Sequence, residues 1–284
     1  MLDTNARLEL HAYAKINLGL HVTAKRPDGY HNIDSLMLRL DVHDTLRLEA
    51  RPADYGISLE VTGAALPDDA NNLAYRAAER YAAAAAHAVK VAVAIQLEKH
   101  IPIAAGLGGG SSDAAAVLRA LARLFPAPID LLSLAASLGA DVPFFVADLA
   151  AARAQGIGEQ LSPLTLPPLA LVLVYPQLEV SAASAYQALR QFSPPLELDN
   201  LLSELHNAET LSCHNSLEAG VVARHPAVAK ALATLQRYPL RNVMMSGSGS
   251  SCFGIAADNS TAQSIAAQLA AEQPSWWVRA CSSG

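Results

Sequence analysis

The sequence predicts an α+β protein built as one large or two moderate domains. Segments with strand and helix patterns interleave without the regular βαβ repeat of a doubly wound sheet. The chain has 284 residues, more than a typical single domain. Hydrophobic residues make up 52% and charged residues 16%, a composition that can fill a sizeable core. The proline-dense stretch "PLTLPPL" (163–169) marks the expected domain boundary.

Strand patterns dominate the first hundred residues. Partial alternation predicts strand structure over Leu8–His21, broken near Lys15, and further strands at Ser35–Leu40, Thr45–Ala50, Ile57–Thr62 and Val91–Glu98. Pro-Asp-Gly in "RPDGYH" (26–31) is turn chemistry, so a turn is expected there. Asn71 and Asn72 predict the cap of a helix that runs to about Ala86.

Helix patterns begin after a glycine-rich segment. One helix is expected from about Ser111 to Leu124, ended by prolines, and a second over Asp130–Leu138. Pro143 predicts a loop or a helix start. For the second half we expect strands at Ala170–Val174 and Trp276–Arg279, a strand–loop–strand unit over 241–256, short helices between Asp199 and His225, and helices near Ser184–Arg190, Ala227–Gln236 and Thr261–Ala271.

Charge and cysteine content exclude several classes of protein. The formal net charge is −6, whereas a nucleic-acid binder normally carries a basic surplus. No apolar run approaches eighteen residues and no signal peptide is visible, so no membrane partner and a cytoplasmic location are expected. The three cysteines are far apart, which favours a reducing compartment over a structural zinc site. An anionic ligand would need local positive charge, for which the candidates are Lys15, favoured here, Arg26, Lys99 and His100.

The segment Gly106–Ser112 holds four glycines and two serines directly before a predicted helix. It is neither a Walker A loop, which needs a lysine, nor a dinucleotide fingerprint, whose third glycine is replaced by Ser111. Two interpretations remain. Backbone amides, serine hydroxyls and the helix dipole can hold a phosphate, or the loop is a connector with Ser111 or Ser112 as N-cap. Asp113 carries negative charge at this helix end, so with an anion bound its side chain must point away, as a capping partner.

A second glycine–serine segment, "SGSGSS" (246–251), lies between two predicted strands. A hairpin turn is one explanation. The segment gains functional weight if it folds over the first loop.

Motifs in this order resemble those of one kinase superfamily. "PIAAGLGGGSSDAA" (102–115) closely resembles the phosphate loop of the galactokinase, homoserine kinase, mevalonate kinase and phosphomevalonate kinase (GHMP) superfamily, "AKINLGL" (14–20) its N-terminal motif, and "MSGSGSSCFG" (245–254) its C-terminal glycine motif. "KRPDGYH" (25–31) and "LGADVPFF" (138–145) resemble signatures of one branch, whose members phosphorylate a cytidine-diphosphate-linked methylerythritol in the non-mevalonate route to isoprenoid precursors.

The resemblance implies the α+β, two-domain GHMP kinase fold. The N-terminal domain, over 1–165, would resemble the second domain of ribosomal protein S5, and the C-terminal domain, over 166–284, would be ferredoxin-like. The resemblance assigns ATP phosphate binding to Pro102, Gly106, Leu107, Gly108, Gly109, Gly110, Ser111 and Ser112, and it assigns the C-terminal glycine loop to Ser246, Gly247, Ser248 and Gly249.

The same resemblance assigns the chemistry. Asp141 matches the catalytic aspartate, which orients the acceptor hydroxyl and takes its proton, and Lys15 matches the active-site lysine, which stabilises charge on the transferring phosphoryl group. Without the resemblance, Asp141 would be a helix N-cap and Lys15 a surface lysine. The substrate-binding residues would be Asn17, Tyr30, His31 and Tyr186, the last three around the cytidine ring.

ATP is therefore expected as co-substrate, with Mg²⁺ held by ligands that the sequence does not reveal. We expect a monomer or a weak homodimer with no nucleic-acid partner. Three alternatives remain at this stage: another GHMP kinase of the homoserine or mevalonate type, the related decarboxylase, and a non-catalytic nucleotide-binding regulator on the same fold.

Overall fold

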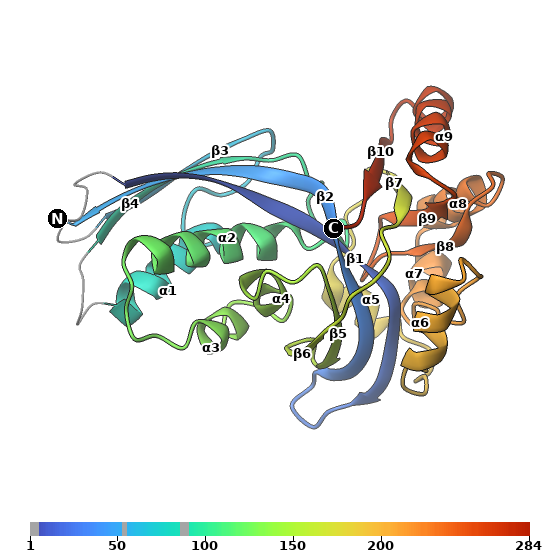
Figure 1. Ribbon diagram of the computed structural model, residues 1–284, viewed down its shortest axis with the longest axis horizontal. Coiled ribbons are helices and arrows are strands. Elements are labelled where there is room, and N and C mark those ends of the chain that lie inside the picture. The colour runs from blue at the N-terminus through green and yellow to red at the C-terminus, as the bar shows by residue number, and fades with distance from the viewer. Residues whose placement is uncertain (1–5, 53–55, 86–90) are drawn as a thin grey trace. The chain divides into compact units, whose positions relative to one another are not determined.

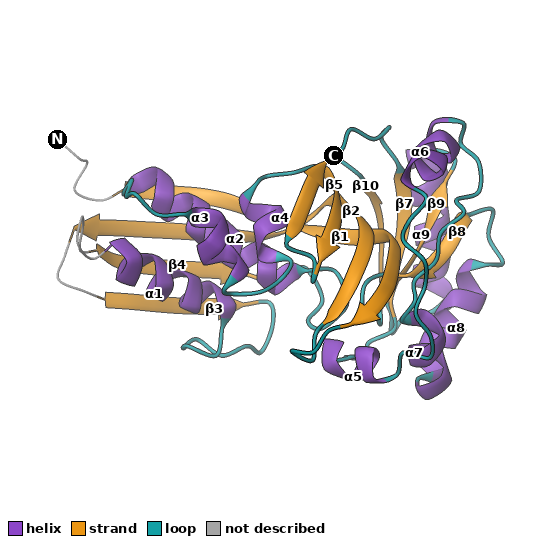
Figure 2. Ribbon diagram, turned by 90° about the horizontal axis from the view of Figure 1, so that it is seen from below, coloured by secondary structure: helices purple, strands orange, loops and turns teal. Residues whose placement is uncertain are grey.

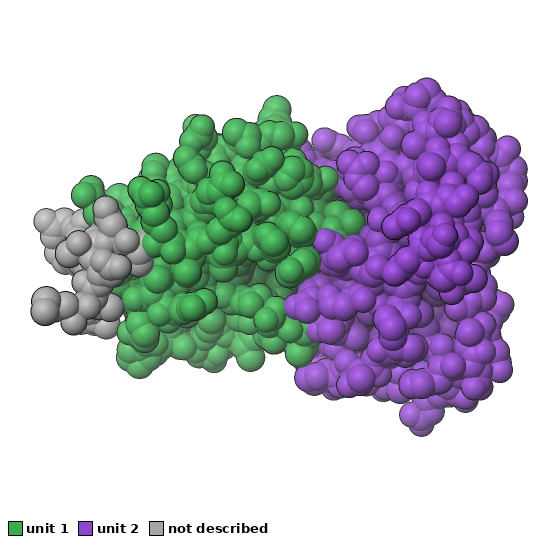
Figure 3. Space-filling view, turned by 45° about the horizontal axis from the view of Figure 1, so that its top comes forward, with its two compact units in different colours: residues 1–14, 42–101, 108–149 green, residues 15–41, 102–107, 150–284 purple. Residues whose placement is uncertain are grey.

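The computed structural model describes residues 6–52, 56–85 and 91–284, which form two compact units (Figure 3). Unit 1 comprises residues 1–14, 42–101 and 108–149, and unit 2 comprises residues 15–41, 102–107 and 150–284. The chain therefore enters each unit more than once. The boundary after residue 165, which we expect from the proline-dense stretch and the family resemblance, divides the chain once along its sequence. It stays a prediction.

Unit 1 packs helices against one face of a sheet (Figure 1). The long strands β1 (Ala6–Lys25) and β2 (His31–Pro52) each contribute one end, beside β3 (Gly56–Thr62) and β4 (Val91–Glu98). β4 pairs antiparallel with β2 and parallel with β3. Alternate residues such as Leu46, Leu48 and Ile95 are buried. The helices are α1 (Leu73–Ala85), α2 (Gly109–Leu124), α3 (Leu131–Ala136) and α4 (Val142–Val146).

Unit 2 contains the other ends of β1 and β2 and a separate four-stranded sheet (Figure 2). β5 (Ala151–Gly156) pairs with β2 and with β6 (Gln160–Pro163). The separate sheet is antiparallel, in the order β10-β7-β9-β8, from β7 (Ala170–Tyr175), β8 (Arg241–Met245), β9 (Cys252–Ala256) and β10 (Trp277–Ser282). The helices are α5 (Ala182–Gln187), α6 (Leu198–His206), α7 (Glu218–Arg224), α8 (Pro226–Leu235) and α9 (Asn259–Glu272).

The predicted break in the first strand near Lys15 is wrong. β1 continues through it, and Ala12, Ala14 and Ile16 keep the buried alternation on one face. Lys15 and Asn17, on the other face, are buried as well. Polar residues in a strand that is buried on both faces look like an interruption when only the sequence is read.

Other element boundaries also differ from the predictions. The two strands predicted over Ser35–Leu40 and Thr45–Ala50 are one strand, β2, and the strands β5 and β6 were not predicted. α2 begins at Gly109, two residues before the predicted start. α1 matches its prediction as far as Ala85, and Ala86 lies outside the described residues. In the described part of the chain, no helix has the length and apolar character that a membrane crossing requires.

Candidate active site

Residues 103–107, which lead into and begin the first glycine loop, are anchored in unit 2 by their backbone carbonyls. The carbonyl oxygens of Ile103, Ala104, Ala105, Gly106 and Leu107 each accept a hydrogen bond from another segment of that unit. The donor to the Leu107 oxygen is the backbone N–H of Lys15, at 2.9 Å. The backbone of the candidate lysine is thus adjacent to the beginning of the loop, at Leu107.

The second glycine loop packs directly on the first. Ser246 Oγ donates to the Gly106 carbonyl at 2.9 Å, and the Ser251 N–H donates to the Ala105 carbonyl at 3.1 Å. A Cβ atom added to Gly106 would lie 2.2 Å from the Ser246 carbonyl oxygen, and one added to Gly247 would lie 3.0 Å from the Gly106 oxygen. The condition that gave the second loop functional weight is therefore met, and only glycine permits this approach.

Helix α2 starts without a side-chain cap. Its N-cap residue is Gly108, in the left-handed region with φ 73°, and no side chain caps the helix. The expectation that Ser111 or Ser112 is the N-cap is wrong because the glycines extend the helix toward the loop. The first amides of α2, those of Gly109, Gly110 and Ser111, have no carbonyl one turn earlier to bind. Amides of this kind at the start of a helix can bind an anion.

Asp113 has a different partner from the one predicted. Instead of capping α2, its Oδ2 accepts a hydrogen bond at 2.7 Å from Nζ of Lys99, at the end of β4, and Lys99 also binds Asp44 Oδ2. All three side chains are almost completely buried. Lys99 is committed to two carboxylates, and the pair of aspartates raises its pKa against the effect of burial. It therefore supplies no spare positive charge to an anion, contrary to one of the sequence candidates.

Lys15 and Asn17 lie on a buried hydrogen-bonded chain in unit 2. Lys15 Nζ donates to Asn17 Oδ1 at 2.8 Å, and Asn17 Nδ2 donates to Ser35 Oγ at 2.7 Å. Ser35 Oγ donates in turn to the Gly19 carbonyl at 2.7 Å. Lys15 is only 4% exposed, so the alternative of a surface lysine is wrong. The chain fixes the side chains of both predicted site residues.

Asp141 stands at the N-cap position of α4 in unit 1, half-buried, and makes no capping hydrogen bond with its side chain. Capping therefore does not account for this carboxylate. Its loop runs beside the start of α2, since a Cβ atom on Gly139 would lie 3.9 Å from Ser111 Oγ. Lys15 belongs to unit 2, and its placement next to Asp141 stays a prediction.

The predicted cytidine-binding residues gather in unit 2. The His31 and Tyr186 rings stack with centroids 5.0 Å apart and planes 22° apart. Burial and, to a smaller extent, Lys25 lower the pKa of His31, which favours the neutral ring. Tyr30, in the turn before His31, is 60% exposed. Because His31 and Tyr186 touch each other, a base can enter between them only if they separate.

Two supporting contacts have no signal in the sequence. Asn215 Nδ2 donates to the carbonyls of Met245 and Gly247, at 2.8 and 2.7 Å, and so holds the second glycine loop. Buried Asp34 receives two hydrogen bonds from Arg153, at 2.8 and 2.6 Å. Asn215 and Met245 are 30 residues apart, and Asp34 and Arg153 are 119 apart, so no local pattern could reveal these pairs.

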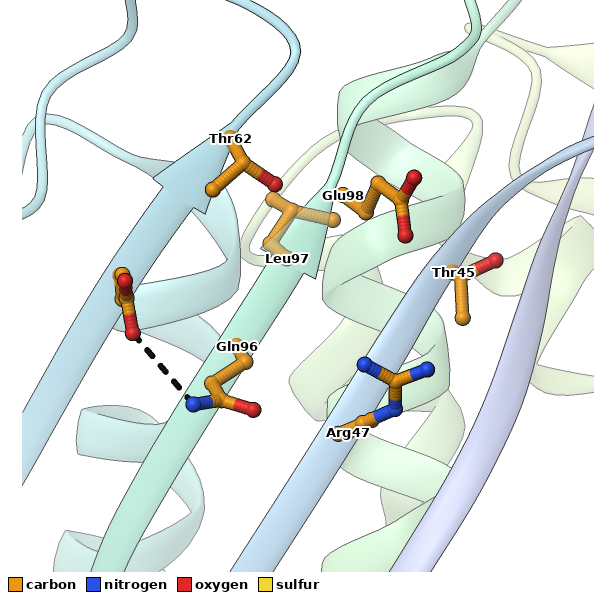
Figure 4. A pocket seen from close by; sticks show the side chains of 7 residues that line it. Thr45, Arg47, Thr62, Gln96, Leu97 and Glu98 are labelled. Atoms are coloured by element: carbon orange, nitrogen blue, oxygen red, sulfur yellow. Dashed lines mark hydrogen bonds between the residues drawn. The ribbon is translucent and has the colours of Figure 1, made fainter.

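A hollow lined mainly by polar residues lies elsewhere on unit 1, over the ends of β3 and β4 and an inner part of β2 (Figure 4). Its charged side chains have partners: Arg47 binds Glu9 at 2.9 Å, Glu98 lies 3.4 Å from His100, and Glu60 accepts a hydrogen bond from Gln96 at 3.4 Å. None of the residues predicted for the site lines it; the lining is Thr45, Arg47, Glu60, Thr62, Gln96, Leu97 and Glu98.

Comparison with known families gives two matches. Residues 72–148 match the family described as GHMP kinases N terminal domain, and residues 183–275 match GHMP kinases C terminal. The first match contains the start of α2 and Asp141, and the second contains the second glycine loop.

Curated relatives cover nearly the whole chain. A protein of Deinococcus radiodurans named 4-diphosphocytidyl-2-C-methyl-D-erythritol kinase is 49% identical, over 95% of this chain and 91% of the relative. One of the same name from Thermus thermophilus is 42% identical, over 95% of each.

Solved structures agree with these matches. The crystal structure of a 4-(cytidine 5'-diphospho)-2C-methyl-D-erythritol kinase is similar with a TM-score of 0.84 and 41% identity, over 98% of this chain and 100% of the other. A homoserine kinase from Cytophaga hutchinsonii, with a TM-score of 0.71 and 18% identity over 100% of this chain and 96% of the other, shares the fold.

Proposed function

The chain belongs to the GHMP kinases, in the family of 4-diphosphocytidyl-2-C-methyl-D-erythritol kinases, and from this premise we propose that it phosphorylates a hydroxyl group of 4-diphosphocytidyl-2-C-methyl-D-erythritol with ATP. The observation that carries the proposal is the contact between Lys15 and the first glycine loop, on which the second glycine loop also packs. This backbone contact supports the proposal that Lys15 is the cation that acts together with the glycine amides on a triphosphate.

The nucleotide phosphates would bind at the start of α2. With the carbonyls of residues 103–107 turned toward other segments, the loop is held in a fixed conformation. The first amides of α2 and the hydroxyl of Ser111 are the donors, and the positive φ angles at Gly106 and Gly108 allow the backbone to approach the ligand. Pro102, Ser112 and Ser248 would complete the ATP side.

Transfer then needs an oriented hydroxyl. Asp141 would accept the hydrogen bond of the acceptor hydroxyl. The hydroxyl oxygen forms a bond to the terminal phosphorus of ATP while the bond from that phosphorus to the bridging oxygen of ADP breaks, and the hydroxyl proton goes to Asp141. Lys15, held by Asn17, would stabilise the charge that develops on the phosphoryl oxygens.

The cytidine end of the acceptor would meet Tyr30, His31 and Tyr186. Flat aromatic rings stack on a pyrimidine, and the neutral imidazole of His31 can exchange a hydrogen bond with the edge of the base. The stack of His31 on Tyr186 indicates that these rings separate when the base enters.

Mg²⁺ would accompany ATP and supply neutralisation of its phosphate charge. No group of three or more His, Cys, Asp or Glu that could hold a metal ion occurs among the residues that the structure describes. Protein carboxylates therefore do not form a ready-made site, and no step above depends on the ion. The three cysteines are free thiols, which supports a cytoplasmic location. We propose a monomer or a weak homodimer.

The test measures ADP release with 4-diphosphocytidyl-2-C-methyl-D-erythritol, homoserine or mevalonate as acceptor. We expect turnover with the first acceptor alone. Lys15→Ala and Asp141→Asn should each lower kcat by roughly 10²–10⁴-fold. Lys230→Ala and Asp130→Asn, which remove an exposed charge of the same kind, should retain wild-type rates. Turnover of homoserine or mevalonate alone would overturn the acceptor assignment, and full activity of Asp141→Asn would overturn the role of Asp141.

A further inference from the structure

The buried cluster of Lys99, Asp44 and Asp113 lies within unit 1, near the start of α2, of which Asp113 is the fifth residue. One ammonium faces two carboxylates, so the cluster carries an excess negative charge when all three groups are ionised. Such a charge is costly away from water. It also lies at the end of the helix to which the phosphates of a nucleotide would bind.

The two carboxylates are not equivalent. Asp44 Oδ1 accepts hydrogen bonds from the backbone N–H groups of His100, at 2.5 Å, and Ile101, at 2.8 Å, while its Oδ2 binds Lys99. Asp113 Oδ2 also binds Lys99, but Oδ1 of Asp113 is buried and has no hydrogen-bond partner among the described residues. Hydrogen bonds stabilise an ionised carboxylate, so Asp113 is the member of the cluster that can most easily accept a proton.

Electrostatics agree with this geometry. Burial raises the pKa of Asp113 to about 7; Lys99 opposes the rise and Asp44 adds to it. These two are the charged groups that act on Asp113. The helix α2 and the helices packed against it also carry charged groups, which are Arg76, Glu79 and Arg80 of α1, Arg119 and Arg123 of α2, Asp130 before α3 and Asp141 before α4.

We propose that Asp113 is a positioning residue of the phosphate loop that takes up a proton from solvent when nucleotide phosphates bind at the start of α2. The proposal rests on the proposed function in one respect, that the loop binds a nucleotide. A nearby phosphate is a like charge, which disfavours the ionised carboxylate. Once protonated, Asp113 keeps the hydrogen bond from Lys99 to Oδ2, and Oδ1 becomes a hydroxyl that no longer needs a charge partner. The cluster is then neutral, and Lys99 still joins α2 to β4.

The proposal predicts a specific pH dependence. The affinity for nucleotide should fall as the pH rises above about 7, approaching about tenfold per pH unit, since one proton is taken up for each nucleotide bound. In Asp113→Asn the amide replaces the neutral acid, so this dependence should disappear and binding at alkaline pH should be tighter than in the wild type. If Asp113 only stabilised the fold, its replacement by Asn would change neither the pH dependence of nucleotide affinity nor the affinity at alkaline pH.

The experiment is isothermal titration of the full-length protein with MgADP at about pH 7.5, in two buffers that differ in protonation enthalpy. The wild type should take up more protons per bound nucleotide than Asp113→Asn. Subtracting the proton uptake of Asp113→Asn from that of the wild type removes the contribution of the nucleotide's own protonation. Asp130→Asn, an exposed change of the same charge, should behave as wild type. Equal proton uptake in wild type and Asp113→Asn would overturn the inference.

A measurement on the wild type alone covers the case in which Asp113→Asn does not fold. Here KM for MgATP should rise with pH above about 7 while KM for the acceptor stays flat. A KM for MgATP that is independent of pH would overturn the inference while leaving the kinase in place. Failure of the wild type to bind MgADP at all would overturn the proposed function, and the inference with it.

Discussion

Replacement of Gly106 by alanine tests the close approach of the two glycine loops. Gly106 has φ +77°, and a Cβ atom there would lie 2.2 Å from the Ser246 carbonyl oxygen and 3.0 Å from the Gly249 nitrogen. These neighbours are backbone atoms, which cannot rotate aside as the end of a flexible side chain does. We therefore expect Gly106→Ala to push the second glycine loop away from the first.

The expected cost has three sources. The left-handed backbone disfavours an L-residue by roughly 1–2 kcal/mol. Ordinary contacts begin at 3.4 Å, so the Ser246 oxygen has to retreat by about 1 Å, and overpacking of this kind costs roughly 1–3 kcal/mol. The retreat also weakens the bond from Ser246 Oγ to the Gly106 carbonyl, worth about 1 kcal/mol. We expect a loss of about 4 kcal/mol in unfolding free energy and, since the loop shifts by about 1 Å, a roughly 10²-fold lower kcat/KM.

Thermal melting and steady-state kinetics measure both effects, and two glycine variants serve as stability controls. Gly29 has φ +89° with no atom within 4 Å of its added Cβ, so Gly29→Ala isolates the backbone cost. Gly110 lies in the first turn of α2, and its added Cβ would make an ordinary 3.6 Å contact with Leu73. Because alanine favours a helix over glycine, Gly110→Ala should raise the unfolding free energy by up to about 1 kcal/mol. If Gly106→Ala melts at the same temperature as Gly29→Ala, the steric argument is refuted.

Three further predictions concern other parts of the molecule. Arg153→Ala should lower the unfolding free energy in urea by about 3 kcal/mol because it leaves the Asp34 carboxylate buried without its partner, and Arg153→Lys should recover only part of the loss. Tyr186→Ala should raise KM for the cytidine-linked acceptor by roughly 3–10-fold, the worth of one aromatic stack, with KM for ATP unchanged in the same assay. Because folding raises the pKa of Asp113 from 3.8 to about 7, the folded state binds the proton more tightly, so the unfolding free energy should fall as the pH rises through this window. Urea titrations of Asp113→Asn should lack that fall.

Local chemistry explains which elements the sequence could predict. Val91–Glu98 alternates cleanly and is the strand β4, and Asn72, which accepts the Ala74 N–H at 2.9 Å, caps the start of α1 as expected. The turn expected from Pro-Asp-Gly lies between the end of β1 at Lys25 and the start of β2 at His31, although the strand ends themselves were predicted at His21 and Ser35. These features depend on neighbours within a few residues, so single-sequence patterns contain them.

The parts that could not be predicted depend on distant partners. Lys15 is buried because β1 is covered on both faces, which no alternation pattern reports. Asp113 was expected to cap its own helix, but Lys99 lies 14 residues before it and Asp44 a further 55 residues before Lys99. Tertiary contacts decide which charged groups pair with each other. The sequence shows that these three groups are present but not that they form a cluster.

The pairing of Lys99 changes how attraction of an anion has to be explained. The chain carries a net charge of −6, and one of its four candidate cations is held by two aspartates. A Walker A loop places a lysine beside the phosphates, whereas here the residue after Gly110 is Ser111. Under the proposed function, the attraction comes chiefly from oriented backbone amides, and Lys15 is the proposed cation. Backbone amides converge on one point most easily where the backbone takes left-handed conformations and side chains are absent. Gly106 and Gly108, both with positive φ before α2, and Gly109 and Gly110 at its start meet these conditions between them, which gives the glycines a physical role under the proposed function.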